Sequence, residues 1–390
     1  MKKVLVPRVR FKGFDEEWKE ERFDNIFFNI QEKNKNRYSI KEYISVASNT
    51  WKKDVNIKNK QTLWNYSVFR VGDIAYEGHT NEAFPFGRFV INRIGTGIIS
   101  NIFTVFRPKA DLSLDFSQYW VNNNLVMIGL LKRSSKSGIM MNSLTLENVN
   151  EEKISLPKYS EQQKIGKLLD QISNLINLEN SKLNKLKQLK ETLLQKMFPE
   201  GNSKTPRIRF RGFNEKWKEE KLDDIFKVIT GGEPPKNYKN SKHPVGKYKY
   251  PIYSNGQEAN AIWGFSDNYS INTEAITISS IGTIGFPVVR KMFFTPIIRL
   301  KTLLPYNKNM NINFLNLSVS QINFSFNQAG IPSMNSNQLK DNIILISRNF
   351  SEQQKIGDFF SKIDTLISLY HSKLNKLKQI KYALLQKMFI

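Results

Sequence analysis

An internal duplication is the strongest constraint on how this chain of 390 residues folds. Three blocks occur twice: 7–27 is repeated as 206–226, 160–166 as 351–357, and 182–198 as 373–389. The intervening segments, 28–150 and 227–345, show no comparable match. Two repeats of about 195 residues are too few and too long for a solenoid. We therefore expect two halves related by a pseudo-twofold axis, each with a shared start, a divergent globular segment and a shared end.

The order of these blocks predicts four segments. We assign a first globular domain to residues 1–155, a first long helix to 156–199, a second globular domain to 200–346 and a second long helix to 347–390. The run 199–206 contains Pro, Gly, Asn and Ser, which favour turns, so it is the expected linker between the halves.

The repeated C-terminal blocks are predicted to be long helices with a coiled-coil seam. Apolar residues recur at alternating steps of four and three, which gives the 3.5-residue period of a coiled coil. The seam consists of Ile165, Leu169, Ile172, Ile176, Leu183, Leu186, Leu193 and Met197 in the first helix and of Ile356, Phe360, Ile363, Ile367, Tyr370, Leu374, Leu377, Leu384 and Met388 in the second. Glu179 and Lys190 interrupt the first stripe, and the neighbouring Leu168, Leu175, Leu189 and Leu194 are expected to widen it.

The two stripes are similar enough to pair with each other. A twofold axis perpendicular to the helices reverses their direction, so we expect an antiparallel pair, with Ile390 close to the segment before Pro7. The alternative is that each helix packs only on its own globular half. Ser160 and Ser351, each with Gln three residues later, predict capping boxes at the two helix starts.

The divergent segments are predicted to mix strands and helices. β-Branched and aromatic runs between Gly, Asn and Pro favour strands at 43–47, 66–76 and 98–106, and at 275–279, 285–289 and 297–300. Helices are expected at 115–131 and 312–320. The expected fold class is α/β in the broad sense (α+β), with two globular domains in pseudo-twofold arrangement joined by two long antiparallel coiled-coil helices.

The charge points to a polyanionic partner. The chain has 59 Lys and Arg against 35 Asp and Glu, a net charge of +24. Only +7 of this lies in the helical segments 160–198 and 351–390, which leaves +17 for the rest of the chain. Such an excess is typical of proteins that bind nucleic acid or an acidic membrane surface. The uncharged apolar stretch 275–289 is too short for a membrane span, and we expect a cytoplasmic protein.

Neither a catalytic centre nor a metal site is expected in this chain. Cysteine is absent, and the three histidines, His79, His243 and His371, lack the spacing of a metal site. There is no phosphate-binding GxxxxGK[ST] loop, and the glycines at 95–97 and 282–285 are interpreted as β-turns. The acids at 15–17 and 20–21 are interpreted as the start of a helix rather than as metal ligands for a nuclease. The repeated aromatics Phe11, Phe14 and Trp18, and Phe210, Phe213 and Trp217, are expected to pack against a helix end.

Two divergent basic globules suit the reading of two unrelated DNA half-sites. Arg can bind guanine, Asn and Gln can bind adenine, and Lys usually binds phosphate. The candidates in the first half are Lys33, Lys35, Arg37, Lys52, Lys53, Arg70, Arg88, Arg93, Lys132, Arg133 and Lys136. Those in the second half are Lys236, Tyr238, Lys239, Lys242, Lys247, Lys249, Asn255, Gln257, Arg290 and Lys291. For any one of them, a solvated surface position is an equally good interpretation.

The sequence resembles the specificity (S) subunits of Type I restriction-modification systems. The resemblance rests on Phe-x-Gly-Phe-x-x-x-Trp, Glu-Gln-Gln-Lys-Ile and Leu-Leu-Gln-Lys-Met-Phe, each present twice, and on the tandem layout of about 200 residues. In the second half, 251–256 followed by 282–285 is similar to a pattern of target recognition domains. The resemblance covers essentially the whole chain.

This resemblance implies a non-catalytic subunit whose two globular domains are target recognition domains for an interrupted site in double-stranded DNA. The helices would set the gap between the half-sites and bind two modification (M) subunits, which carry S-adenosylmethionine and methylate adenine. Restriction (R) subunits, which use ATP with Mg²⁺, would join this core, and the chain itself would hold no cofactor. The alternatives are an architectural DNA-binding protein that dimerises through its coiled coil, and a stand-alone nuclease.

Overall fold

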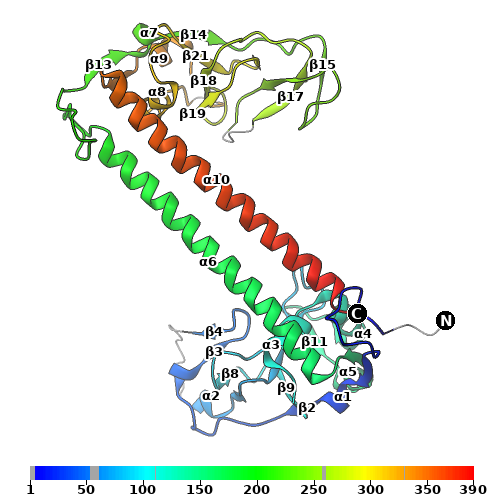
Figure 1. The fold of residues 1–390 in the computed structure, drawn as a ribbon. Helices are drawn as coiled ribbons and strands as arrows, with labels where there is room; N and C mark the ends of the chain where they lie inside the picture. The colour runs from blue at the N-terminus through cyan, green and yellow to red at the C-terminus, as the bar shows by residue number, and fades with distance from the viewer. Residues whose placement is uncertain (1–4, 53–60, 110, 257–260, 329) are drawn as a thin grey trace. The chain divides into compact units, whose positions relative to one another are not determined.

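The protein, described by a computed structural model over residues 5–52, 61–109, 111–256, 261–328 and 330–390, divides into two compact units (Figure 1). Unit 1 comprises Met1–Asn180 and Ser372–Ile390, and unit 2 comprises Ser181–His371. Each unit therefore contains one globular domain, the start of one long helix and the end of the other. The division lies within both helices rather than at the ends of the globular segments.

The two long helices are confirmed as α6 (Tyr159–Met197) and α10 (Phe350–Lys387). Their seam residues are buried or half-buried. Leu168 and Leu194 also pack into the cores, but Leu175 and Leu189 are exposed, so the seam is narrower than expected. Both helices begin one residue before the expected caps, which places Ser160 and Ser351 inside the first turn. At α10 the capping side chain is Asn349, whose Oδ1 accepts from the Glu352 N–H at 3.3 Å.

The helix segments run antiparallel within each unit. In unit 1, Ile165 and Leu169 near the start of α6 share a core with Met388 at the end of α10, whereas Glu179 lies opposite Lys373. In unit 2, Met197 at the end of α6 shares a core with Ile356 near the start of α10. The alternative in which each helix packs only on its own half is therefore wrong.

Both units contain a four-stranded antiparallel sheet with the same strand order. Unit 1 has β2 (Phe27–Ile30), β9 (Thr104–Pro108), β6 (Ile74–Glu77) and β7 (Arg88–Ile91), in that order. Unit 2 has β14 (Phe226–Thr230), β21 (Lys301–Pro305), β18 (Ala275–Ser279) and β19 (Gly285–Arg290). The two domains thus share one sheet topology although their sequences diverge, because the buried positions of the strands can be filled by many different apolar side chains.

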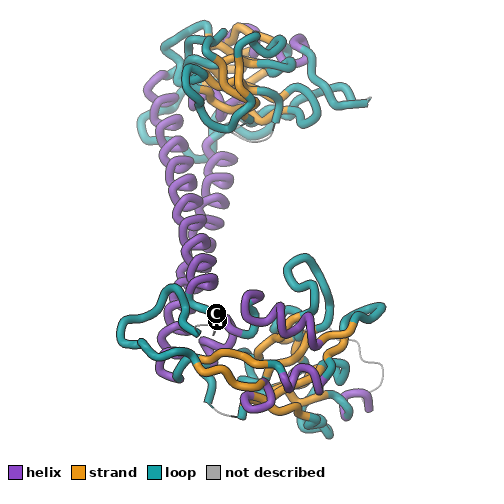
Figure 2. Tube along the Cα trace, turned by 90° about the vertical axis from the view of Figure 1, so that its right-hand side faces the viewer, coloured by secondary structure: helices purple, strands orange, loops and turns teal. Residues whose placement is uncertain are grey.

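The remaining elements complete each unit around this sheet, and strands and short helices lie together in each (Figure 2). Unit 1 adds β1 (Lys19–Arg22), α1 (Phe23–Ile26), a 3₁₀ turn (Ile40–Glu42), β3 (Ile44–Ser45), β4 (Thr50–Trp51), α2 (Gln61–Trp64), β5 (Ser67–Phe69), β8 (Gly97–Ile99), α3 (Leu114–Trp120), α4 (Asn124–Ser134), β10 (Ser135–Lys136), β11 (Ser143–Leu144), α5 (Leu146–Glu151) and β12 (Lys153–Leu156). Unit 2 adds β13 (Lys218–Lys221), α7 (Leu222–Ile225), β15 (Tyr238–Lys239), β16 (Tyr250–Tyr253), β17 (Ile262–Ser266), β20 (Thr295–Pro296), α8 (Ile312–Val319), α9 (Ser336–Lys340) and β22 (Ile343–Ile346).

Most of the expected elements are present, and five differ. The single strand expected at 66–76 is divided into β5 and β6, and the one expected at 98–106 into β8 and β9. The helix expected at 115–131 is broken into α3 and α4 because Asn123 caps the second helix, with its Oδ1 accepting from the Leu125 N–H at 3.0 Å. The strand expected at 297–300 is a turn, since Ile298 and Arg299 have φ angles of 51° and 59°. The acids Glu20 and Glu21 lie in β1, not at a helix start, and pair with β12.

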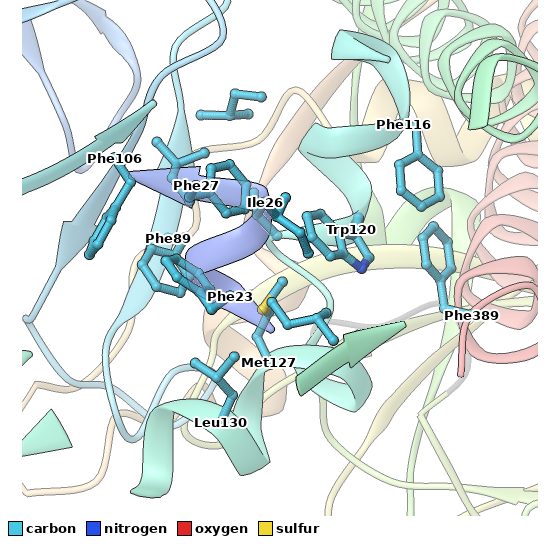
Figure 3. Packing of buried hydrophobic residues seen from close by; sticks show 14 of the residues in the cluster. Phe23, Ile26, Phe27, Phe89, Phe106, Phe116, Trp120, Met127, Leu130 and Phe389 are labelled. Carbon is cyan, nitrogen blue, oxygen red and sulfur yellow. The ribbon is translucent and has the colours of Figure 1, made fainter. Parts of the chain in front are cut away.

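The repeated Trp anchors the end of a long helix in each unit. In unit 1, Trp18 lies in the core with Phe116 and with Phe389, the penultimate residue of the chain. The rings of Phe116 and Phe389 stack with centroids 5.5 Å apart (Figure 3). In unit 2, Trp217, Phe314 and Phe198 repeat this cluster, with Phe198 directly after α6. The end of each long helix therefore completes the core of the globular domain that belongs to the other repeat.

A buried ion pair fixes the start of each long helix to the repeated N-terminal block. Arg10 donates from Nε and Nη2 to the two carboxylate oxygens of Glu161, at 2.7 and 2.8 Å, and Arg209 binds Glu352 in the same way at 2.6 and 2.8 Å. Both carboxylates are completely buried. The backbone adds a second link, since the Val9 N–H donates to the Lys387 carbonyl at 2.9 Å. This contact, and the packing of Leu5 and Ile390 on one core, confirm the expected closeness of the chain ends.

Candidate nucleic-acid interface

A lysine-rich surface lies in unit 2, next to a second sheet ordered β15, β17, β16, β20. Residues 236–249, which we call the lysine segment, hold five lysines and no acid. Lys239 and Lys247 place their ammonium groups 5.9 and 5.4 Å from the centre of the Tyr248 ring. Only Lys247 forms an ion pair among the described residues of this segment, at 3.1 Å from Asp267. The segment therefore presents several lysines to solvent, which suits phosphate binding.

Aromatic rings lie beside the lysine segment. Tyr238 packs against Trp263 with ring centroids 4.6 Å apart, and Tyr238 is exposed. Tyr269 contacts Tyr250 at 4.9 Å and Phe293 at 4.8 Å, and Tyr269 and Phe293 are also exposed. Alternating cations and aromatic faces suit contact with both the phosphates and the sugars or bases of a nucleic acid. Of these rings, only Tyr238 is among the residues predicted from the sequence, although the alternation of Lys and Tyr at 247–250 is a usable signal for the others.

Two of the expected base-reading residues of unit 2 have structural roles. Arg290 is buried, with its guanidinium 3.9 Å from the centre of the Tyr253 ring and Nε donating to Thr277 Oγ1 at 3.0 Å. Burial lowers the pKa of Arg290. Asn255 accepts from the Ser280 N–H at 2.8 Å and donates to the Ile298 carbonyl at 2.5 Å, which holds the left-handed turn at 298–299. Lys236, Lys242, Lys249 and Lys291 are exposed, and Gln257 lies outside the described residues.

The arginines of unit 1 are organised around one carboxylate. Glu32 accepts from Arg37 at 2.8 Å, from Arg70 at 2.8 Å and from Arg107 at 3.3 Å. Arg107 also bonds the buried Asp73. These hydrogen bonds, the one from Arg70 above all, lower the pKa of Glu32 to about 2. Three guanidinium groups share two acids here, so the cluster keeps positive charge while its side chains are held in place.

The same surface carries the DNA-binding candidates of segment 33–37, which form a turn. Lys35 and Asn36 adopt left-handed φ angles of 47° and 64°, and Arg37 donates to the Lys33 carbonyl at 2.8 Å. Lys35 is exposed and Lys33 is half-buried. The structure thus brings Lys33, Lys35, Arg37 and Arg70 together, and adds Arg107, which sequence reasoning missed because it lies 75 residues from Glu32.

Three other candidates of unit 1 form ion pairs with acids. Arg88 pairs with the buried Glu77 at 3.2 Å, and Arg133 with Glu152 at 2.5 Å. Arg93 donates to Asp115 at 2.6 Å and Asp170 at 3.1 Å, which joins α3 to α6. The Tyr119 hydroxyl donates to the same Asp170 at 2.7 Å, and burial raises the pKa of Tyr119 to about 12. Arg93 is therefore part of the scaffold between domain and helix.

The last candidates of unit 1 are exposed lysines. Lys52 follows the exposed Trp51 at the end of β4, and Lys53 lies outside the described residues. Lys132 lies in the last turn of α4 and Lys136 in β10. Lys132 and Lys136 lie near the base of the β10–β11 hairpin and are separate in sequence from the Glu32 cluster.

The described part of the chain contains no group of three or more His, Asp or Glu residues placed to hold a metal ion. No helix within the described ranges has both the length and the apolarity to cross a bilayer.

The repeated aromatics pack against the starts of the long helices, as expected. The Lys164 ammonium lies 4.9 Å from the centre of the Phe14 ring, and the Lys355 ammonium lies 5.0 Å from the centre of the Phe213 ring.

Comparison with known proteins identifies the family. The family model of the Type I restriction modification DNA specificity domain matches residues 15–188 and 214–379, one match for each repeat. A putative type I specificity subunit of Mycoplasma pneumoniae is 33% identical over 144 residues, which are 37% of this chain and 39% of that protein. A second one from the same organism is 35% identical over 113 residues, 28% of this chain and 33% of that protein. The matches thus span about two-fifths or less of these relatives.

The solved structures agree on the fold. The crystal structure of the S subunit of a Type I restriction-modification system from M. genitalium aligns with a TM-score of 0.63 and 15% sequence identity, over 99% of each chain. Together with two family matches that cover most of both repeats, this leads to one assignment: the chain belongs to the family of Type I restriction-modification DNA specificity proteins.

Proposed function

We propose that this protein is the non-catalytic DNA-specificity subunit of a Type I restriction-modification complex, in which each globular domain reads one half of an interrupted site in double-stranded DNA. The observation that carries the proposal is the combination of one shared sheet topology with two different basic surfaces. The lysine segment of unit 2 and the arginine cluster around Glu32 in unit 1 present different donors. Different donors on one scaffold are what the reading of two different half-sites requires.

The exposed residues of the long helices favour the binding of two identical partner proteins. Outside the seam, unit 1 exposes Leu175 and Leu178 from α6 and Ile380 from α10. Unit 2 exposes the residues 191 positions away, namely Leu366 and Leu369 from α10 and Leu189 from α6. The same three positions, drawn from both helices, are therefore left apolar and exposed in each unit. Equivalent apolar patches favour binding of two copies of one protein, and we assign them to two modification subunits.

The catalytic chemistry would reside in those partners. The modification subunits would carry S-adenosylmethionine and methylate adenine, and restriction subunits would supply ATP- and Mg²⁺-dependent cleavage. The helices of this chain would set the gap between the half-sites. Its own residues would bind and position the DNA.

Co-purification tests the assignment. Full-length protein co-expressed with the modification subunit is expected to form a complex with two modification chains, stable in high salt. A homodimer of this chain that excludes the modification subunit would instead support an architectural DNA-binding protein. Cleavage of DNA by the isolated chain with Mg²⁺ would support a nuclease.

DNA binding by that complex tests the lysine segment. Each phosphate contact contributes about 0.9 to the slope of log K against log salt concentration. Replacing Lys236, Lys239, Lys242, Lys247 and Lys249 by Gln is expected to lower the slope by up to about 4.5, with a similar loss of affinity for every sequence. The matched control replaces five exposed helix lysines, Lys185, Lys187, Lys196, Lys376 and Lys378, and is expected to leave the slope nearly unchanged. Equal effects of both sets would place the lysine segment outside the interface.

A further inference from the structure

Each unit carries an exposed apolar tip that the reading surfaces do not explain. In unit 1, the hairpin of β10 and β11 ends in Gly138-Ile139-Met140, where Ile139 is 107% exposed and Met140 is 87% exposed. In unit 2, Gly330-Ile331 occupies the equivalent turn before α9, and Ile331 is 72% exposed. We call residues 138–140 and 330–331 the tips. Asn-Ser follows both, four residues after Gly138 and five residues after Gly330, so the two segments are a short match with one inserted residue.

The tips are attached at the same point of the fold. In unit 1, the Asn142 N–H donates to the carbonyl of Gly78, directly after β6, at 2.8 Å. In unit 2, the Met334 N–H donates to the carbonyl of Ser280, directly after β18, at 2.9 Å. Strands β6 and β18 hold the same place in their sheets. A side chain at Gly78 would meet the Asn142 carbonyl at 1.9 Å, so this attachment depends on glycine.

Packing cannot account for the shared isoleucine. A side chain as exposed as Ile139 or Ile331 buries little apolar surface and contributes little to stability. A turn that needs only Gly and Asn would accept a polar residue at this place, and exposed polar residues are the common case. The repeated isoleucine therefore points to a contact that both domains make outside the chain.

The form of the tip favours DNA over a protein partner. A stable protein interface buries about 800 Å² on each side, far more than one or two side chains at a turn offer. A single projecting apolar residue is what proteins insert between base pairs from the minor groove, beside Lys, Arg, Asn or Gln. Lys132 and Lys136 lie at the base of the first tip, and Asn327 and Gln328 precede the second. Such insertion is tolerant of sequence, which explains why the tip is shared while the reading surfaces differ.

We propose that the tips are DNA wedges: Ile139 with Met140, and Ile331, insert into the groove at their respective half-sites and unstack one base step each. This rests on the proposed function and adds a sequence-tolerant distortion to the sequence-specific contacts. Insertion of the wedge would determine the position of each globular domain along its DNA half-site.

The test uses the complex with its modification subunits and a duplex that carries the methylated motif of the host. The variants are Ile139→Ala with Met140→Ala, and Ile331→Ala. The control is Ile102→Ala, an exposed isoleucine of unit 1 outside the tips. Because the tips bury little, every variant is expected to unfold at the wild-type temperature. Loss of the contact of one buried isoleucine predicts binding about tenfold weaker for each tip variant, and unchanged binding for the control.

2-Aminopurine placed at successive steps of the duplex reports unstacking. Wild-type complex is expected to raise its fluorescence at one step in each half-site, and each tip variant is expected to abolish the rise in its own half only. Tip variants with wild-type affinity and fluorescence would overturn the wedge. Loss of the modification subunits from a tip variant would also overturn it, in favour of a protein contact. If wild-type complex fails to distinguish the motif from a scrambled duplex, the proposed function itself fails.

Discussion

Phe389→Ala is the most informative change to the fold, because Phe389 is the penultimate residue yet belongs to the core of the first domain. Its ring stacks on Phe116 at 5.5 Å and meets Trp18 edge-on at 6.4 Å, and only 4% of the residue is exposed. Truncation of a buried Phe to Ala costs about 3–5 kcal/mol. For a unit of this size, about 2–4 °C of melting temperature is lost per kcal/mol, so unit 1 is expected to unfold about 10 °C lower.

The assay must separate the two units. Hydrogen exchange followed by mass spectrometry reports on peptides from residues 5–180 and 181–371 independently. Phe389→Ala is expected to accelerate exchange around Trp18 and Phe116 and to leave the peptides around Trp217 unchanged. The mirror variant Phe198→Ala is expected to do the reverse, because Phe198 packs on Trp217 at 5.3 Å. Ile380→Ala, an exposed position on α10, is the control.

The effect of Phe389→Ala should be confined to unit 1, because the end of α10 packs into the core of that unit. If Phe389→Ala destabilised the peptides of unit 2 first, or left all peptides unchanged, the end of α10 would not complete unit 1. The account of the two cores would then be wrong.

Three further predictions follow from the ion pairs and the helix surface. Glu161→Gln breaks a buried bidentate ion pair with Arg10 and is expected to lower the free energy of unfolding of unit 1 by about 3 kcal/mol. The measurement is the thermal midpoint of each unit, which should fall for unit 1 alone. An unchanged midpoint would show that the ion pair makes no net contribution to stability. The pKa of Glu32 is lowered to about 2, so its contribution to stability is present above its ordinary pKa and is lost as pH falls from about 4.5 towards 2. Glu32→Gln is expected to make the stability of unit 1 depend less on pH in this range. An unchanged dependence of stability on pH would contradict the ion pairs between Glu32 and the arginines. The double variant Leu178→Asp with Leu369→Asp changes two exposed helix positions and is expected to leave the melting temperature unchanged. It is expected to release the modification subunits from the complex. Full retention of both modification subunits would rule out these patches as the binding surface.

The scaffold could be predicted from the sequence because its signals are local or repeated. A period of 3.5 over more than four heptads determines α6 and α10, and the duplication determines their antiparallel pairing. The exact starts were missed, since any of several polar residues near Ser160 and Ser351 can begin the helix. The turn at 297–300 was missed because its apolar residues favour a strand, whereas the hydrogen bonds of Asn255, 43 residues away, hold it left-handed.

The candidate site was only partly predictable, because the roles of its arginines depend on residues that are distant in the sequence. Charge alone marks Arg70, Arg88, Arg93 and Arg290 as equivalent, and only the fold shows that Arg93 joins α3 to α6 and that Arg290 is buried against Tyr253. The carboxylate and hydroxyl partners of these arginine side chains lie between 11 and 77 residues away. The lysine segment was found because five lysines without an acid are visible in the sequence itself.

Methylome sequencing of a host that expresses only this system tests the central claim most directly. The two-reader account predicts a bipartite methylated motif with a fixed gap. It also predicts that exchange of residues 28–150 for those of another family member changes one half of the motif and leaves the other half and the gap intact. A continuous motif, or a change in both halves after this exchange, would contradict it.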